Sequence, residues 1–101
     1  MIEENMAENI DVELVKKAMF KILDDINRAT LIYKSRALFE DESSYQLIQD
    51  KIVYDRINQL DVQFHDYWYY LAQNMIRGTE LSDEEVDNLH DYANAIMAIK
   101  W

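Results

Sequence analysis

Residues 44–77 read SYQLIQDKIVYDRINQLDVQFHDYWYYLAQNMIR, and this stretch decides the fold. No proline or glycine interrupts it, and its apolar residues recur every three or four positions, which is the spacing of one face of an α-helix. The recurring residues are Val53, Ile57, Leu60, Phe64, Trp68, Leu71 and Met75. The pattern predicts one long helix, with Ser43 and Gln46 at capping-box spacing before it. A break near 58–61 would give two shorter helices, although no residue forces one.

Two further helices are predicted on either side of this stretch. In 11–39 the residues at helical spacing are Val15, Met19, Ile22, Ile26, Ala29 and Tyr33. In 83–99 the start is marked by the capping box Ser82–Glu85, flanked by Leu81 and Val86 at the positions of a hydrophobic staple. The sequence therefore predicts an all-α fold: an antiparallel helical bundle of three helices, two long and one shorter, or of four helices if the second one breaks.

The composition agrees with one folded domain over 1–101. The chain has 101 residues, no proline and a single glycine, Gly78, so it can form few tight turns. Half of the residues are hydrophobic, which is enough for a core. Residues 1–9 are dense in acids and show no periodic apolar face, so we expect them to be mobile.

Charge and composition exclude several classes of protein. Without cysteine the chain has no disulfides, zinc–thiolate sites or thiol catalysis. The net charge of −10 disfavours direct binding to nucleic acid or to anionic membranes, because both need lysine and arginine. No apolar run approaches the roughly 20 residues of a membrane span, and the acidic start is unlike a signal segment. We therefore expect a cytoplasmic protein whose partners are other proteins.

The second helix is apolar on more than one face. Val62, Tyr69 and Ile76 lie seven residues apart, away from the main stripe, and the first helix repeats this more weakly with Phe20, Leu31 and Leu38. Four consecutive aromatic residues, 67–70, sweep about 300° of a helix and cannot all face one core. The second face is covered by the third helix, by a second copy in a homodimer, or by a foreign partner. The residues that we expect at such an interface are Val62, Tyr69, Tyr70, Ile76 and Trp101.

The sequence offers little catalytic equipment. Asp61 and His65, and likewise Asp87 and His90, share a helical face, but the Glu-x-x-His elements of a di-iron bundle are missing. His90 stands beside apolar positions and is expected at the edge of the core. Paired carboxylates occur where water reaches them, and no phosphate-binding loop or nucleophile motif is present. We expect neither enzymatic activity, nor a cofactor, nor a bound metal.

The acidic residues of the third helix support one sharper hypothesis. A row of carboxylates can imitate the phosphates of DNA and block a nucleic-acid-binding protein. The residues of this acidic surface are Glu80, Asp83, Glu84, Asp87 and Asp91. The leading hypothesis remains a non-catalytic interaction module, a small regulator or inhibitor that occupies a partner protein and self-associates through helix faces. A DNA mimic, and a bundle that binds a small ligand or a metal, are the alternatives.

Overall fold

The computed structural model describes residues 9–101 and contains three helices in that range. They are α2 (Val12–Ala37), α3 (Tyr45–Ile76) and α4 (Asp83–Met97), and the described residues include no strand. The prediction of an all-α bundle with two long helices and one shorter helix is confirmed. The alternative of four helices is wrong for this range, because α3 runs unbroken through 58–61. The expected mobility of 1–9 falls almost wholly on residues outside the described range.

Each helix begins at a side chain that accepts a backbone N–H. Asp11 accepts from the Leu14 N–H over 3.1 Å, and Ser82 forms with Glu85 the complete capping box that the sequence predicts. The predicted cap at Ser43 is wrong by one residue. Ser44 caps α3 by accepting from the Leu47 N–H over 3.3 Å, whereas the Ser43 N–H donates to Asp41 in the preceding turn.

Gly78 ends α3 and turns the chain back toward α4. Its φ of +79° lies in the left-handed region, where residues with a Cβ are strained. The Gly78 N–H donates to the Met75 carbonyl over 3.1 Å, and the Thr79 N–H donates to the Asn74 carbonyl over 2.8 Å. These two bonds form the Schellman arrangement that satisfies the last carbonyls of the helix.

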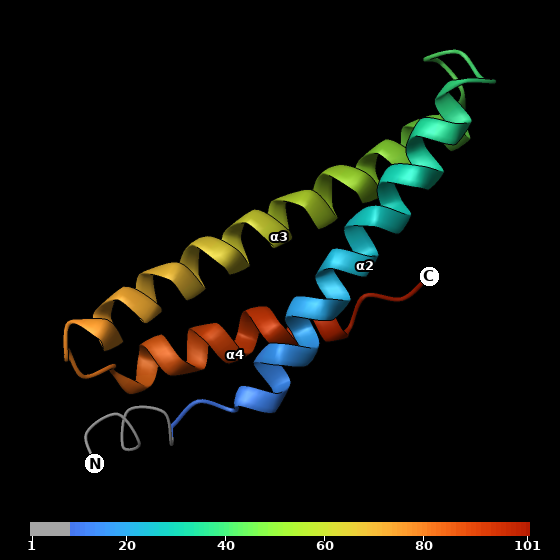
Figure 1. Ribbon diagram of the computed structural model, residues 1–101. Helices are drawn as coiled ribbons and strands as arrows, with labels where there is room; N and C mark the ends of the chain where they lie inside the picture. Colours follow the sequence, from blue (N-terminus) through green and yellow to red (C-terminus); the bar gives the residue numbers. More distant parts are fainter. Residues whose placement is uncertain (1–8) are drawn as a thin grey trace.

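The three helices form a long hairpin with a shorter third helix along part of it. α2 and α3 run antiparallel and diverge slightly from the turn that joins them, and α4 folds back beside the end of the hairpin that holds the start of α2 (Figure 1). At 1.5 Å per residue α3 is about 48 Å long and α4 only about 22 Å. The molecule is accordingly elongated, at 57 × 20 × 18 Å. We call the two-helix part beyond α4, residues 28–56, the arm.

The core lies where all three helices meet. Its largest fully buried side chains are Phe64, Ile22, Leu71, Leu89 and Ile96. On α3 the buried residues Ile57, Phe64 and Leu71 are seven residues apart, a 3.5-residue period that keeps one seam toward a neighbouring helix. The predicted stripe follows a 3.6-residue period instead, so its residues move progressively away from this seam toward the start of α3. Val53 is therefore 40% exposed, and Tyr54 turns inward to stack on Tyr33 with ring centroids 5.4 Å apart.

Within residues 9–101, none of the three helices combines the length and the apolar character that a membrane crossing requires.

Candidate interaction surfaces

A stripe of three apolar residues stands exposed along α3. Val62, Tyr69 and Ile76 are 51%, 65% and 85% exposed, and their spacing of seven residues places them in one row. Tyr69 follows Tyr67 by two residues, about 200° around the helix. Since Tyr67 packs against α4, the stripe lies on the flank of the hairpin that faces away from α4. We call these three residues the α3 stripe.

The neighbouring helix widens this surface. Leu23 follows Lys21 by two residues, and Lys21 donates to the Ile99 carbonyl in the C-terminal tail on the α4 side. Leu23 therefore also faces away from α4, and Val12, eleven residues earlier, lies in nearly the same row. The two side chains are 51% and 46% exposed. The flank opposite α4 thus presents apolar side chains from both long helices.

The aromatic run 67–70 is distributed around α3 as its length requires. Tyr67 packs on Tyr92 with ring centroids 5.6 Å apart, and its hydroxyl donates to the Glu85 carbonyl over 3.3 Å. Burial raises the pKa of Tyr67 above its usual value. Trp68 is half-buried against the core, Tyr69 is exposed, and Tyr70 is 50% exposed. α4 covers the Tyr67 side of the run and leaves the Tyr69 side open.

The five residues expected at one interface occupy three separate places. Only Val62, Tyr69 and Ile76 share a row. Tyr70 lies on the other flank of α3, with its ring centroid 6.0 Å from that of Tyr67. Trp101 is 49% exposed and lies against α2, where its ring is 5.3 Å from the Arg28 guanidinium. The sequence could not separate these three places because they depend on where α4 and the C-terminal tail pack.

A buried carboxylate holds the C-terminal tail. Asp25 is 4% exposed, and it accepts hydrogen bonds from the Lys21 ammonium over 2.8 Å and from the Trp101 indole N–H over 3.0 Å. Lys21 also donates to the Ile99 carbonyl over 2.9 Å. The network pairs the buried charge and fixes residues 99–101 on α2, as buried carboxylates require. Nothing in the local sequence around Asp25 indicates this role.

The acidic surface lies along the exposed side of α4 and includes Glu80 in the connection before this helix. Glu80, Asp83, Glu84, Asp87 and Asp91 are all exposed, and none of them forms an ion pair with another described residue. The neighbouring Glu85 differs, because the Ser82 backbone N–H holds its pKa below the usual value. The capping box is therefore intact above the unfolded pKa of Glu85, and it weakens as the pH falls through the folded value.

Each of the two histidines contacts an aspartate. His90 is half-buried, and its Nε2 accepts the Asp11 backbone N–H over 2.9 Å, which ties the start of α2 to α4. Its predicted place at the core edge is confirmed. His65 Nδ1 lies 2.9 Å from the Asp61 carboxylate and equally close to the Asp61 carbonyl. Over residues 9–101, no three His, Cys, Asp or Glu side chains come close enough together to hold a metal ion.

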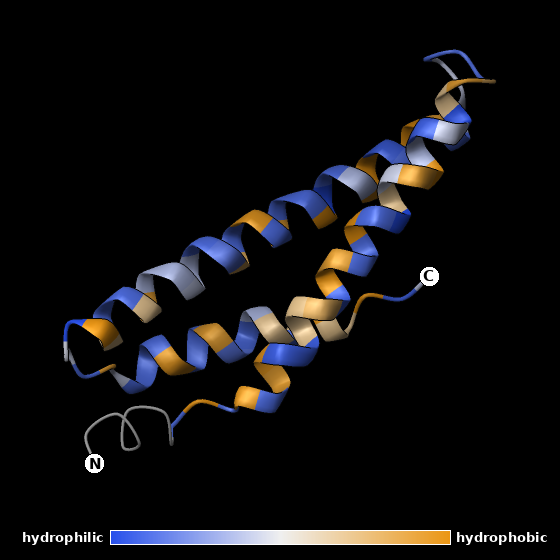
Figure 2. Ribbon diagram, in the orientation of Figure 1, coloured by the Kyte–Doolittle hydropathy of each residue, from blue (hydrophilic) through white to orange (hydrophobic). Residues whose placement is uncertain are grey.

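The arm exposes a further set of large apolar residues. Phe39, Leu38 and Tyr45 are 86%, 79% and 76% exposed around the turn, and Leu31, Ile48 and Ile52 are also exposed. Apolar positions continue along both helices past the end of α4 (Figure 2). Leu31 and Leu38 were visible in the sequence as off-stripe residues. The other feature of the sequence that indicates an exposed surface here is the third predicted helix, which is too short to cover the whole hairpin.

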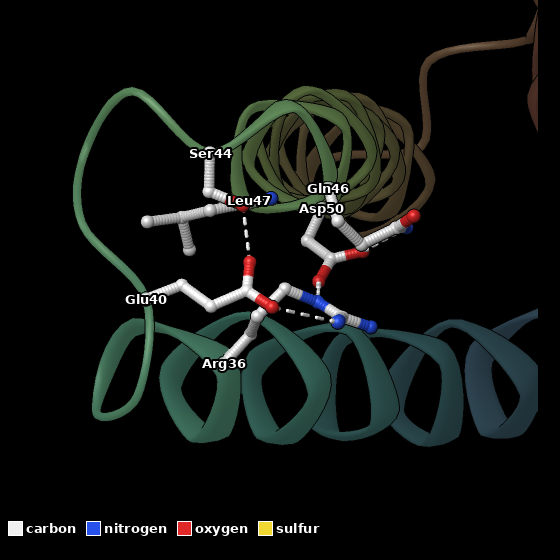
Figure 3. A network of polar contacts seen from close by, with 6 residues as sticks. All are labelled: Arg36, Glu40, Ser44, Gln46, Leu47 and Asp50. Atoms are coloured by element: carbon white, nitrogen blue, oxygen red, sulfur yellow. Dashed lines mark hydrogen bonds and ion pairs between the residues drawn. The ribbon is translucent and has the colours of Figure 1, made fainter.

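Polar contacts join the two helices of the arm near its tip. Arg36 donates to the Asp50 carboxylate and lies 3.6 Å from Glu40, while the Ser44 hydroxyl donates to Glu40 (Figure 3). The hydrogen bond to Asp50 raises the pKa of Arg36 above its usual value. Leu47 is the hydrophobic side chain buried beside this network. At this end the two helices are therefore held together largely by charged hydrogen bonds rather than by buried apolar side chains.

Comparison of the chain with known protein families, with curated proteins and with solved structures found no significant match.

Proposed function

We propose that the protein is a non-catalytic interaction module, a small regulator that occupies a partner protein and also self-associates through its helix faces. The observation that carries the proposal is the exposed α3 stripe, widened by Leu23 and Val12 on α2. Exposed tyrosine and large aliphatic side chains in one row suit the apolar face of a partner helix, which contacts such a surface at helical spacing. The buried Asp25 carboxylate accepts hydrogen bonds from Lys21 and Trp101, so its oxygens already have partners within the chain. This agrees with a binding role rather than a catalytic one.

Substitution of the α3 stripe is expected to abolish partner binding without unfolding the chain. Proteins captured by the wild type from cells that make it are identified, and the purified candidate is titrated against variants by calorimetry. Ile76→Asp puts a charge in the apolar contact, and Tyr69→Ala removes an aromatic anchor. Each should weaken binding roughly 30-fold or more, corresponding to about 2 kcal/mol. Circular dichroism should be unchanged because both side chains are exposed.

Gln63→Ala provides the matched control on the same helix. Gln63 is exposed and lies about 100–120° around the helix from Val62 and Tyr69, so this variant should bind like the wild type. Equal affinities of the wild type, Tyr69→Ala and Ile76→Asp for the purified partner would show that the stripe is not the interface.

A DNA mimic is the second candidate, and the row of exposed carboxylates on α4 favours it. Asp83, Asp87 and Asp91 are four residues apart on a helix, so their side chains project from one face. A mimic would bind a basic partner in competition with duplex DNA, and its affinity would fall steeply as salt rises. We expect Asp87→Asn with Asp91→Asn to weaken such a complex at low salt and to reduce its salt dependence. Affinity that does not change between low and high salt would eliminate this candidate.

A further inference from the structure

The outer side of α2 carries a row of exposed apolar side chains. Phe20, Leu31 and Leu38 are 75%, 68% and 79% exposed. They are eleven and seven residues apart, so they lie within about 20° of one another around the helix. Ile22 and Ala29 each follow or precede a member of the row by two residues, about 200° around the helix, and both are buried in the core. The row therefore faces away from the core.

This row belongs to a seam that a second helix can follow. The exposed residues along it alternate by three and four positions, and they are Lys17, Phe20, Asp24, Asn27, Leu31, Lys34 and Leu38. Such alternation is the 3.5-residue repeat by which one helix packs along another. We call these seven residues the α2 seam, which is about 32 Å long at 1.5 Å per residue. At its middle lies a shallow hollow of about 390 Å³, which a side chain of a second helix can enter; it is lined by Asp24, Asn27, Arg28 and Leu31.

The exposed charges on this side of α2 are mostly positive. Within 14–39, four exposed bases form no ion pair with another described residue, namely Lys16, Lys17, Arg28 and Lys34. Asp24 is the one exposed acid of that range, and Glu13 lies one turn before the seam. Lys16 and Arg28 border the seam, and the residues that border a helix seam determine which partner pairs with it. A partner that complements this side of α2 is therefore acidic.

The rest of the molecule has the opposite sign of charge. Residues 14–39 hold six bases and two acids, whereas the remaining residues hold four bases and eighteen acids. Exposed charges more than about 8 Å apart are largely screened at physiological salt, so a bound helix responds mainly to the charges beside the seam. An acidic helix is thus attracted to this side of α2 and repelled by the other surfaces of the molecule.

Two other occupants of an exposed helix face fit these observations less well. A second copy that docks on the same seam about a two-fold axis brings the bases of one copy against those of the other. An anionic membrane is repelled by the net charge of −10, and Asp24 and Asn27 interrupt the apolar row that would enter the lipid. An acidic helix is the occupant that both the charge and the spacing of the seam favour.

We propose that the α2 seam binds an acidic amphipathic helix of another protein. The apolar side chains of that helix contact Phe20, Leu31 and Leu38, and its carboxylates pair with the bases in and beside the seam. The inference goes beyond the proposed function, because it assigns a second partner, of stated charge, to a different side of the molecule. It does not depend on the α3 stripe, and with both surfaces in use the protein holds two partners at once.

A synthetic peptide tests the site directly. The probe is a helix-forming peptide as long as the seam, with leucines at alternating three- and four-residue spacing and glutamates beside them. Its counterpart carries glutamine in place of every glutamate. In calorimetry at low salt the full chain should bind the acidic peptide about tenfold more tightly than the neutral one, because four ion pairs of modest strength are added. This preference is expected although the chain and the acidic peptide are both negative overall.

Variants show whether the peptide lies on α2. Leu31→Asp should weaken its binding roughly 30-fold or more, since a charge enters the apolar contact. Lys16→Gln with Lys34→Gln should weaken it about threefold and reduce its salt dependence. The matched control, Lys51→Gln with Arg77→Gln, changes the net charge equally but lies on α3 and at its end, so it should bind like the wild type. All of these side chains are exposed, and circular dichroism of the variants should match the wild type.

The outcomes that overturn the inference are distinct. They include no binding of the acidic peptide, equal affinity for the acidic and the neutral peptide, and unchanged affinity in Leu31→Asp. A chain that is dimeric by light scattering, and monomeric as Leu31→Asp, shows that a second copy occupies the seam. Binding to phosphatidylserine vesicles that Leu31→Asp abolishes shows that a membrane does.

Failure of this inference is separable from failure of the proposed function. Tyr69→Ala and Ile76→Asp lie on the α3 stripe, so both variants should bind the acidic peptide like the wild type. Their loss of binding to the purified partner is measured separately and does not depend on the peptide. Weaker peptide binding in these two variants, with Leu31→Asp unchanged, would place the peptide on the stripe and overturn the α2 site.

Discussion

Phe64→Ala should remove about 3–5 kcal/mol from the free energy of unfolding, the largest effect expected of any single substitution in this chain. Phe64 is fully buried at the level where all three helices meet, and it lies in the same seam as Ile57 and Leu71. Truncation would leave a cavity that helices fixed at both ends by caps cannot collapse to fill. Domains of this size have total stabilities of about 5–15 kcal/mol, so the variant would be close to unfolding at room temperature.

Urea denaturation followed by circular dichroism, at one protein concentration, measures this loss. Phe20→Ala is its control, since the same side chain is deleted where it is 75% exposed. We expect that variant to differ from the wild type by no more than about 0.5 kcal/mol. Equal losses at the two positions would mean that Phe64 does not lie in the core described above.

The elements of the fold were predictable because their signals are local. The capping box Ser82–Glu85 and the turn at Gly78 act through hydrogen bonds within a few residues, and the capping box forms as the sequence predicts. Ser44 replaced Ser43 as the cap of α3 for a reason equally local. Asp41 offers its carboxylate to the Ser43 N–H over 2.9 Å, which keeps Ser43 in the turn.

The direction in which the side chains of the arm point was harder to predict from the sequence. A straight helix and a supercoiled one differ by about 20° for every seven residues, and from Phe64 to Val53 this drift moves a residue from the core to its edge. Tyr54, rather than Val53, consequently meets α2 at Tyr33. The helix against which α3 packs determines whether its apolar residues repeat every 3.5 or every 3.6 positions, and a single sequence does not identify that helix.

The candidate surfaces likewise combine features that the local sequence predicts with features that depend on how distant segments pack. The run 67–70 revealed that some aromatic ring had to lie outside the core, but which one depends on the side that α4 covers. Tyr67 contacts Tyr92 on α4, so Tyr69 is the ring left open. Trp101 and Asp25 are 76 positions apart in the sequence, and no local sequence pattern predicts a contact between residues so far apart.

Asp25→Ala should cost about 2–3 kcal/mol and release the C-terminal tail. The substitution leaves the Lys21 ammonium and the Trp101 indole N–H without their acceptor. Removal of one member of a buried pair costs about 3–5 kcal/mol in the most enclosed cases. Lys21 is 25% exposed and can turn toward water, so the expected loss is smaller. The neighbouring Asp24 is exposed, and Asp24→Ala should change stability by less than about 0.5 kcal/mol.

The tail can be observed directly through its indole. In a ¹H–¹⁵N spectrum the Trp101 Nε1–H signal, assigned with Trp101→Phe, should shift toward that of a solvent-exposed indole in Asp25→Ala and stay in place in Asp24→Ala. A double-mutant cycle between Asp25→Ala and Trp101→Phe should show a coupling of about 1 kcal/mol, because the two side chains share a hydrogen bond. Additive losses with an unmoved indole signal would contradict this anchor.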